Sequence, residues 1–229
     1  NFFLVYNIQM SQITRILPRG DWDKVVINEN GEQLVLLQDA KRMVLGDRFF
    51  PDLNCEYRVR ETVAKMLHKA SEYLSEGYKL VIVEGLRSLD RQKEHWNNKA
   101  VKFKNQHPDW SEEKIGHEVG LVVSRPNPLA NHNCGGAVDV TLTDVHGKLL
   151  DMGTIPQAPK ERIFVEMFSQ LIAQDQAENR KILREVMEKA GFVWYPGEWW
   201  HYCYGDRMWA VYTGKKECFY GPIQSIKRI

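Results

Sequence analysis

The spacing of apolar residues predicts the central elements of this chain. Between residues 60 and 76, apolar side chains recur every three or four positions, as on one face of a helix, and Gly77 then ends the pattern. The run 78–83 is short, apolar and rich in residues that favour strands, which predicts a buried strand. A helix is expected over about 89–103, and Ser111 has the position of an N-cap that opens a further helix.

The run 136–142 alternates with a period of two, which predicts a strand with two different faces. Val138 and Val140 share the face that enters the core, whereas Asp139 lies on the opposite face, where an acid in a strand needs a partner. Residues 144–147 predict a hairpin turn that follows this strand.

Later segments predict two more helices and a last hairpin. The helices are expected over roughly 161–173 and 177–190. The runs 192–194 and 199–204 flank a Pro-Gly turn and predict two paired strands. Residues 1–58 mix short apolar runs with Gly, Asn, Asp and Pro, and predict strands and irregular wrapping.

The order of these elements predicts an α+β fold, in which a small antiparallel sheet has helices packed on one face. The 229 residues contain no repeat, low-complexity tract or flexible linker, so one domain is expected over 1–229. Within it, residues 1–58 are the N-terminal wrapping segment and residues 59–229 are the core that carries the chemistry.

Composition and charge exclude several classes of partner. Lys and Arg total 31 and Asp and Glu total 30, so the net charge of +1 attracts neither nucleic acid nor an anionic membrane over long range. No apolar run approaches the roughly 20 residues of a membrane span, and the apolar residues 2–6 are too few for a complete signal peptide. Four scattered cysteines do not form a disulfide scaffold and leave the compartment, cytoplasmic or periplasmic, open.

Two histidines and two acids have the spacing of a metal site. His132 precedes the strand that carries Asp139, so a loop can bring its ring over the strand face, and the sequence Glu-Trp-Trp-His ends at His201. Two imidazoles and one carboxylate leave a fourth position open, which is the coordination of a catalytic zinc ion rather than a structural one. Glu198 then has the place of a general base for a metal-activated water. This role requires a bend, because residues 198 and 201 of a straight strand point to opposite faces.

Each of these residues has an ordinary alternative when it is taken singly. His132 could be a surface loop histidine, His201 a core histidine bonded to the backbone, and Glu198 a solvated turn acid. Arg87 follows the buried strand at a turn, where site residues are often carried, but it could also be a solvated arginine at the start of a helix.

Two rival arrangements use cysteine. His132-x-Cys134 and His201-x-Cys203 could form a Cys₂His₂ structural zinc site, which would leave Asp139 without a purpose. Cys134 could instead be a nucleophile with a histidine as its base. No cationic neighbour or helix N-terminus is evident that would lower the pKa of its thiol.

The run 132–142 together with Glu-x-x-His at 198–201 resembles the zinc D-alanyl-D-alanine dipeptidases of the VanX type, within the wider group of D-Ala-D-Ala metallopeptidases and hedgehog-like folds. The similarity extends from about residue 80 to residue 202. The resemblance implies that His132, Asp139 and His201 bind one zinc ion. It also implies that Glu198 is the base that acts on the zinc-bound water and that Arg87 stabilises the oxyanion.

The chain departs from the family pattern at the substrate side. The family triplet Tyr-Arg-Pro is Leu-Arg-Ser at 86–88, its Asp three residues before the arginine is Glu84, and an Asp that binds the free amine of the dipeptide aligns with Gln157. Glutamine can still accept a hydrogen bond from an ammonium, without the strength of a charged acceptor. Asn131, Glu84 and Gln157 are therefore predicted to contact the substrate.

The resemblance implies hydrolysis of D-alanyl-D-alanine into D-alanine, in the turnover of cell-wall fragments. An alternative is a D,D-carboxypeptidase or peptidoglycan endopeptidase that acts on longer peptides, which the exchange at Gln157 favours. An alternative of another class is a non-catalytic zinc-binding interaction domain, against which Glu198 and Arg87 both argue. The expected partner is thus a small D,D-dipeptide or a peptide derived from peptidoglycan, with zinc as the cofactor.

Overall fold

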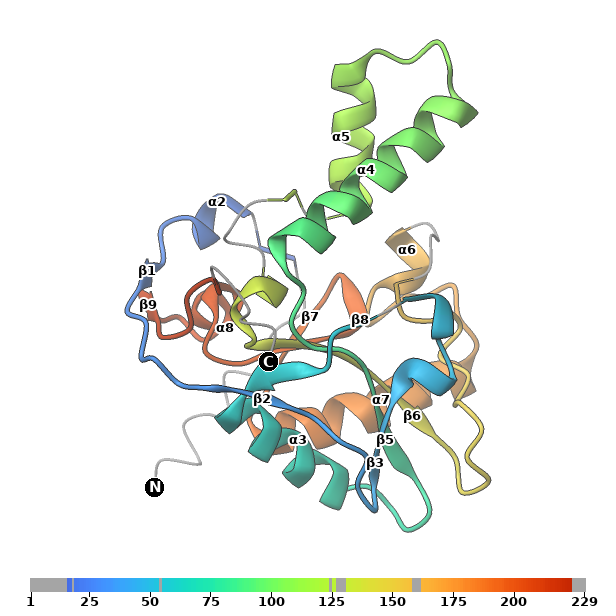
Figure 1. Cartoon of the computed structure of the whole chain (residues 1–229). Coiled ribbons are helices and arrows are strands. Elements are labelled where there is room, and N and C mark those ends of the chain that lie inside the picture. The colour runs from blue at the N-terminus through green and yellow to red at the C-terminus, as the bar shows by residue number, and fades with distance from the viewer. Residues whose placement is uncertain are drawn as a thin grey trace.

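Five strands form the main sheet of the protein, whose computed structural model describes residues 16–17, 19–53, 55–123, 125–126, 131–157 and 162–223 (Figure 1). In spatial order the strands are β3 (Met43–Leu45), β5 (Lys79–Glu84), β6 (Ala137–Thr143), β8 (Glu198–Cys203) and β7 (Val193–Tyr195). All neighbours are antiparallel except β3 and β5, which are parallel. The expected α+β class is confirmed, and the sheet is mixed because β3 joins its edge in parallel.

Two long helices, α3 (Glu61–Glu72) and α7 (Gln174–Ala190), pack on each other and on one face of this sheet. A hairpin of α4 (Leu89–Gln106) and α5 (Glu112–Val122) extends away from the rest of the molecule (Figure 1). None of the helices in the described ranges is both long and apolar enough to cross a membrane.

Short elements complete the described part of the chain. They are α2 (Arg19–Trp22), α6 (Arg162–Val165), α8 (Arg207–Tyr212), η1 (Gly46–Arg48), η2 (Pro51–Leu53) and η3 (Asn131–Cys134). Two small sheets pair β1 (Val26–Ile27) with β9 (Glu217–Cys218), and β2 (Leu34–Leu36) with β4 (Arg58–Arg60). The described part of the N-terminal segment therefore supplies strands to all three sheets, while the apolar residues 2–6 lie outside the described residues. The division at residue 58 remains a prediction.

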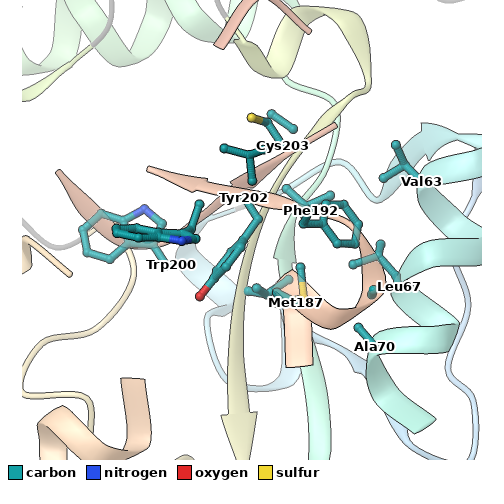
Figure 2. Packing of buried hydrophobic residues seen from close by; sticks show 14 of the residues in the cluster. Val63, Leu67, Ala70, Met187, Phe192, Trp200, Tyr202 and Cys203 are labelled. Atoms are coloured by element: carbon teal, nitrogen blue, oxygen red, sulfur yellow. The ribbon is translucent and has the colours of Figure 1, made fainter. Parts of the chain in front are cut away.

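One part of the core lies between the sheet and the two long helices. Val63, Leu67 and Ala70 of α3 face Met187 of α7 and Phe192 (Figure 2). Burying side chains of this kind stabilises a fold by roughly 1.5–3 kcal/mol each before the entropy of ordering is subtracted. This layer makes the sheet a rigid support for whatever its opposite face carries.

Most predicted elements are present with small shifts at their ends. The expected strand 136–142 is β6, and Val138, Val140 and Leu142 are fully buried in the core. Ser111 does cap α5, since its hydroxyl accepts from the amide of Lys114. The turn after β6 is confirmed by a hydrogen bond from the amide of Asp144 to the carbonyl of Lys148 (2.8 Å).

The predicted helix over 161–173 is wrong. Only α6 (Arg162–Val165) is helical, and α7 starts at Gln174, three residues before the expected position. Backbone groups that a longer helix would use have tertiary partners instead. The amide of Met167 donates to the carbonyl of Pro196 (2.9 Å), and the carbonyl of Glu166 accepts from the side chain of Arg180 (2.6 Å). Apolar spacing does not reveal such distant partners.

Candidate active site

Three polar residues form one row across three neighbouring strands. Glu84 of β5 is the ladder partner of Asp139 of β6, and Asp139 is the partner of His201 of β8. Side chains in such a row lie side by side on the same face of the sheet, here the face opposite α3 and α7. Sequence-distant residues are thereby brought into one site.

A β-bulge brings Glu84 into this row. The register of the β5–β6 ladder shifts between Ile82 and Glu84, where Val83 is the extra residue. Without the shift, Glu84 would share the face of Leu80 and Ile82, both of which are in the core. A bulge turns a side chain to the other face in this way, so Glu84 reaches the site although it is completely buried.

His132 reaches the site from η3, the short helix before β6. Its Nδ1 lies 2.7 Å from the carbonyl oxygen of Gly85, so this nitrogen donates and Nε2 keeps its lone pair. The amide of Arg87 also donates to the carbonyl of His132 (3.1 Å). The turn after β5 therefore fixes both the position and the tautomer of the ring, as outer partners of metal-binding histidines usually do.

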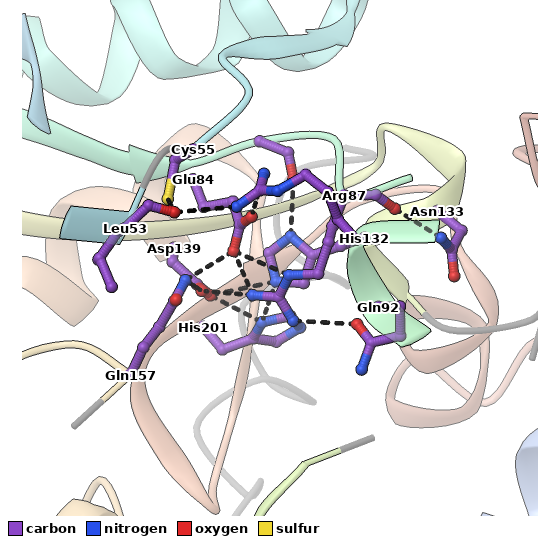
Figure 3. Close-up of polar contacts among 12 residues, drawn as sticks. Leu53, Cys55, Glu84, Arg87, Gln92, His132, Asn133, Asp139, Gln157 and His201 are labelled. Carbon is purple, nitrogen blue, oxygen red and sulfur yellow. Dashed lines mark hydrogen bonds and ion pairs between the residues drawn. The ribbon is translucent and has the colours of Figure 1, made fainter. Parts of the chain in front are cut away.

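The three predicted ligand atoms meet at a common centre (Figure 3). His132 Nε2 lies 3.1 Å from His201 Nδ1 and 3.2 Å from Asp139 Oδ1, and His201 Nδ1 lies 3.0 Å from the same oxygen. Because His132 Nε2 carries no hydrogen, only His201 Nδ1 could donate within this group, and one hydrogen cannot satisfy all three contacts. At least the contact between His132 Nε2 and Asp139 Oδ1 then brings two lone pairs together. A cation among the three atoms removes this conflict, and the two nitrogens and one oxygen are donors that zinc accepts.

Charge in this cluster favours the ionised carboxylate. Burial alone would raise the pKa of Asp139, but His132 and His201 together hold it well below its usual range. Burial would likewise lower the pKa of His201, but the hydrogen bond to Asp139 and the charges of Asp139 and Glu198 together outweigh burial and raise this pKa. The site is thus built to keep a negative charge on Asp139, which is the form that binds a metal.

Glu198 begins β8, and its carboxyl is close enough to His132, Asp139 and His201 to be affected by their charges. The β7–β8 ladder shifts its register between Trp194 and Tyr195, so Glu198 and His201 do not belong to one straight strand. The bend that a base at this position requires is therefore present. Burial raises the pKa of Glu198, and the charges of His201 and Asp139 also act on it.

Arg87 is held at the site by acidic and amide partners. Its Nε donates to Glu84 Oε2 (3.0 Å), a second nitrogen also contacts this oxygen, and a third donates to Gln92 Oε1 (3.2 Å). Arg91 lies 2.9 Å from the other oxygen of Glu84. Burial would lower the pKa of Arg87, but Glu84 outweighs this and raises it. Arg87 therefore stays charged, 3.8 Å from Asp139 Oδ2.

Arg91 and Gln92 are partners that the sequence did not suggest. Both lie in the first turn of α4, whose N-cap Ser88 accepts from the amide of Arg91. The helix thereby turns two polar side chains back towards the end of β5. Their positions, four and five residues after Arg87, could have pointed to them as partners of the site. Polar residues at these positions are equally common in the first turn of a solvated helix, so the sequence alone did not single them out.

The three predicted substrate contacts lie in different surroundings. Glu84 has both oxygens occupied by Arg87 and Arg91, and Gln157 donates to Glu84 as well as to Asp139. The amide nitrogen of Asn131 lies 3.5 Å from the sulfur of Met208. Contact of these three side chains with a substrate remains a prediction.

The cysteine alternatives find no support in the described residues. All four cysteines are free, and the histidines group with Asp139 rather than with Cys134 or Cys203. Cys134 is buried, and burial raises the pKa of its thiol far above neutrality. A protonated thiol is neither a metal ligand nor a nucleophile.

The peptidase M15 family model, described as D-ala-D-ala dipeptidase, matches residues 55–220. The chain belongs to this family. The resemblance seen in the sequence is thereby confirmed, and it covers every residue of the site from Glu84 to His201.

Individual members of the M15 family match parts of the chain. A D-alanyl-D-alanine dipeptidase of Synechocystis sp. is 34% identical over 119 residues, which cover 43% of this chain and 45% of that protein. A D-alanyl-D-alanine dipeptidase of Escherichia coli is 37% identical over 73 residues, which cover 32% of this chain and 37% of that protein. The matches thus span less than half of the length of these relatives.

Among solved structures, the vancomycin resistance D,D-pentapeptidase VanY in complex with Zn(II) superposes with a TM-score of 0.49 at 16% identity. The superposition covers 85% of this chain and 96% of that chain.

Proposed function

We propose that this M15 member is a zinc-dependent hydrolase of D-alanyl-D-alanine, with His132, Asp139 and His201 as the ligands of one zinc ion. The observation that carries the proposal is the convergence of these three donor atoms within 3.2 Å of one another. A bound zinc ion lowers the pKa of a water molecule towards about 7 and polarises a substrate carbonyl.

Glu198 is the general base in this proposal. Its carboxylate accepts the proton of the attacking water and passes it to the amine of the leaving D-alanine, so that the peptide bond breaks between carbon and nitrogen. Burial that raises the pKa of Glu198 makes it a better proton acceptor, since general bases work best with a pKa near the working pH.

Arg87 stabilises the oxyanion that forms on the attacked carbonyl. Its guanidinium is already held by Glu84 and Gln92, so it need not reorganise when the negative charge develops. Glu84 holds Arg87 with one oxygen and is paired with Arg91 through the other, and Asn131 is the candidate for direct contact with the substrate.

Hydrolysis of longer peptides that end in D-Ala-D-Ala is the second candidate. It is favoured by Gln157, because a neutral amide stands where a carboxylate would attract the free amine of a dipeptide. A non-catalytic zinc-binding domain would need neither Glu198 nor Arg87 beside the ligands.

The test measures D-alanine released by the zinc-loaded protein from D-Ala-D-Ala and from a pentapeptide ending in D-Ala-D-Ala. We expect release from the dipeptide, none from L-Ala-L-Ala, loss of activity with a chelator and recovery with added zinc. Cleavage of the pentapeptide alone would favour the second candidate. Zinc bound at one ion per chain without cleavage of either D,D-peptide would overturn the proposed activity.

A further inference from the structure

One amide nitrogen of the site bridges two carboxylates. Gln157 Nε2 lies 2.6 Å from Glu84 Oε2 and 2.8 Å from Asp139 Oδ2 (Figure 3). The amide group carries two N–H bonds, and an ionised carboxylate can only accept, so each acid receives one hydrogen. The opposite orientation of the amide would place its carbonyl oxygen against two negative groups. The partners therefore fix which way the amide of Gln157 faces.

Because of this bridge, the two carboxylate oxygens of Asp139 have different partners. Oδ1 is the atom that faces the ring nitrogens of His132 and His201, whereas Oδ2 accepts from Gln157. A carboxylate held by its second oxygen cannot rotate to offer both oxygens or to turn away. This is the orientation that a ligand bound through one oxygen needs.

The same amide reaches the arginine side of the site. Glu84 Oε2, which accepts from Gln157, also accepts from Nε of Arg87. Gln157 is thus linked through one carboxylate to the cluster of metal donors and through the other to Arg87. A carboxylate at position 157 could not make this bridge, because it has no hydrogen to donate.

The segment that carries Gln157 is anchored before it reaches the site. The carbonyl of Met152 accepts from Arg180, and the hydroxyl of Thr154 accepts from the indole of Trp199 (2.7 Å). Gln157 itself has a φ of +59°, a conformation that non-glycine residues rarely adopt. Such a backbone persists where the surrounding contacts determine it, and it often marks a functional position.

We propose that Gln157 is a positioning residue, which locks Asp139 and Glu84 in one arrangement so that the metal ligand and the support of Arg87 are oriented together. The inference rests on the proposed function in that it takes Asp139 as a zinc ligand. It differs from a direct substrate contact because the N–H groups of Gln157 are already engaged by protein.

The test compares Gln157→Met with Gln170→Met. Methionine has nearly the same length as glutamine but donates no hydrogen bond. Gln170 is an exposed residue whose amide donates to the carbonyl of Phe168, far from the acids of the site in the sequence. The dissociation constant of zinc is measured by chelator competition, and kcat and KM are measured on the zinc-loaded protein. Gln157→Ala is the second variant, since it removes the same donors without a long side chain.

We expect both Gln157 variants to bind zinc roughly 10–100-fold more weakly than the parent, as loss of an outer partner usually does, and Gln170→Met to bind it equally well. When saturated with zinc, they should lose kcat with little change in KM. Unchanged zinc affinity with a raised KM would overturn the proposal and leave Gln157 as a substrate contact. Zinc binding without peptidase activity in the parent would refute only the proposed function, because the zinc affinities still decide the role of Gln157.

Discussion

Asp139 and His201 are direct partners in the ladder between β6 and β8, and a carboxylate oxygen of the first lies 3.0 Å from a ring nitrogen of the second. Two residues 62 positions apart are thereby held by backbone hydrogen bonds rather than by loops. Sites on strands are positioned more accurately than sites on loops. Only His132 comes from a short helix, and its Nδ1 is tied to Gly85 at the end of β5.

Replacement of Glu198 by glutamine should separate metal binding from catalysis. The Glu198→Gln variant keeps the size of the side chain but cannot take a proton, so we expect turnover to fall roughly 10²–10⁴-fold. Zinc should remain at one ion per chain, measured by elemental analysis, because Glu198 is not among the three donors. Glu178→Gln, an exposed acid paired with Lys181, is the control and should keep full activity. Substantial turnover by zinc-loaded Glu198→Gln would refute the base assignment.

The same variant should be more stable than the parent in the zinc-free state. Burial raises the pKa of Glu198 in the folded protein above its ordinary value of 4.5, so the folded state holds its proton more tightly than the unfolded state does. The contribution of Glu198 to the free energy of unfolding is therefore fully present below about pH 4.5 and is lost as the pH rises through the pKa of the folded state.

Glutamine resembles the protonated acid at every pH, so the gain in melting temperature for Glu198→Gln should appear at neutral pH and vanish near pH 4. Thermal melts of both zinc-free proteins across this range measure it. A constant difference between the two proteins at all pH values would contradict an origin in the titration of Glu198.

Removal of the guanidinium at position 87 should depress kcat. One preorganised oxyanion donor contributes roughly 3–4 kcal/mol, so Arg87→Ala should slow turnover about 10²–10³-fold. The metal content should not change, because Arg87 touches Asp139 only at 3.8 Å. Arg48→Ala removes an exposed ion pair with Asp39 and is the matched control. A variant that loses zinc but regains full turnover when zinc is in excess would show that Arg87 supports the metal rather than the oxyanion.

The sequence was sufficient to predict the site residues that belong to regular patterns of apolar and polar positions. The alternation along 136–142 placed Asp139 opposite the core side chains, and the grouping of two histidines with it followed from ligand chemistry. The position of Glu198 before His201 and of Arg87 after a buried strand made both residues candidates, and the resemblance implied a role for each.

The supporting contacts were not predictable in the same way. The bulge that turns Glu84 to the site depends on one extra residue in a ladder with a strand more than 50 positions away. The bridge of Gln157 and the turns around Arg91 and Gln92 depend likewise on tertiary geometry. The predicted helix over 161–173 was wrong for the same reason, since backbone groups in this range form hydrogen bonds with residues distant in the sequence.

Arg180 shows that such tertiary contacts also hold residues that are not part of the candidate site. It is 1% exposed, and it donates to the carbonyls of Met152, Glu166 and Phe164 at 2.6–2.9 Å. Burial lowers its pKa to about 10, which still leaves it charged at neutral pH. One side chain thus donates to Met152, on the segment that leads to the site residue Gln157, and to Phe164 and Glu166, which follow Gln157 in the sequence.

Arg180→Met should therefore destabilise the protein by roughly 3–4 kcal/mol, because the carbonyls of Met152 and Phe164 lose this donor and a buried carbonyl without a partner costs about 1–3 kcal/mol. The carbonyl of Glu166 keeps the amide of Ser169 as a donor (3.1 Å). Lys181→Met on the same helix removes only an exposed ion pair with Glu178 and should change stability by less than about 0.5 kcal/mol. Urea unfolding of both variants in the zinc-free state measures the difference. Equal midpoints would mean that water replaces the guanidinium at these carbonyls, and the segment would then be held by Trp199 and Thr154 rather than by Arg180.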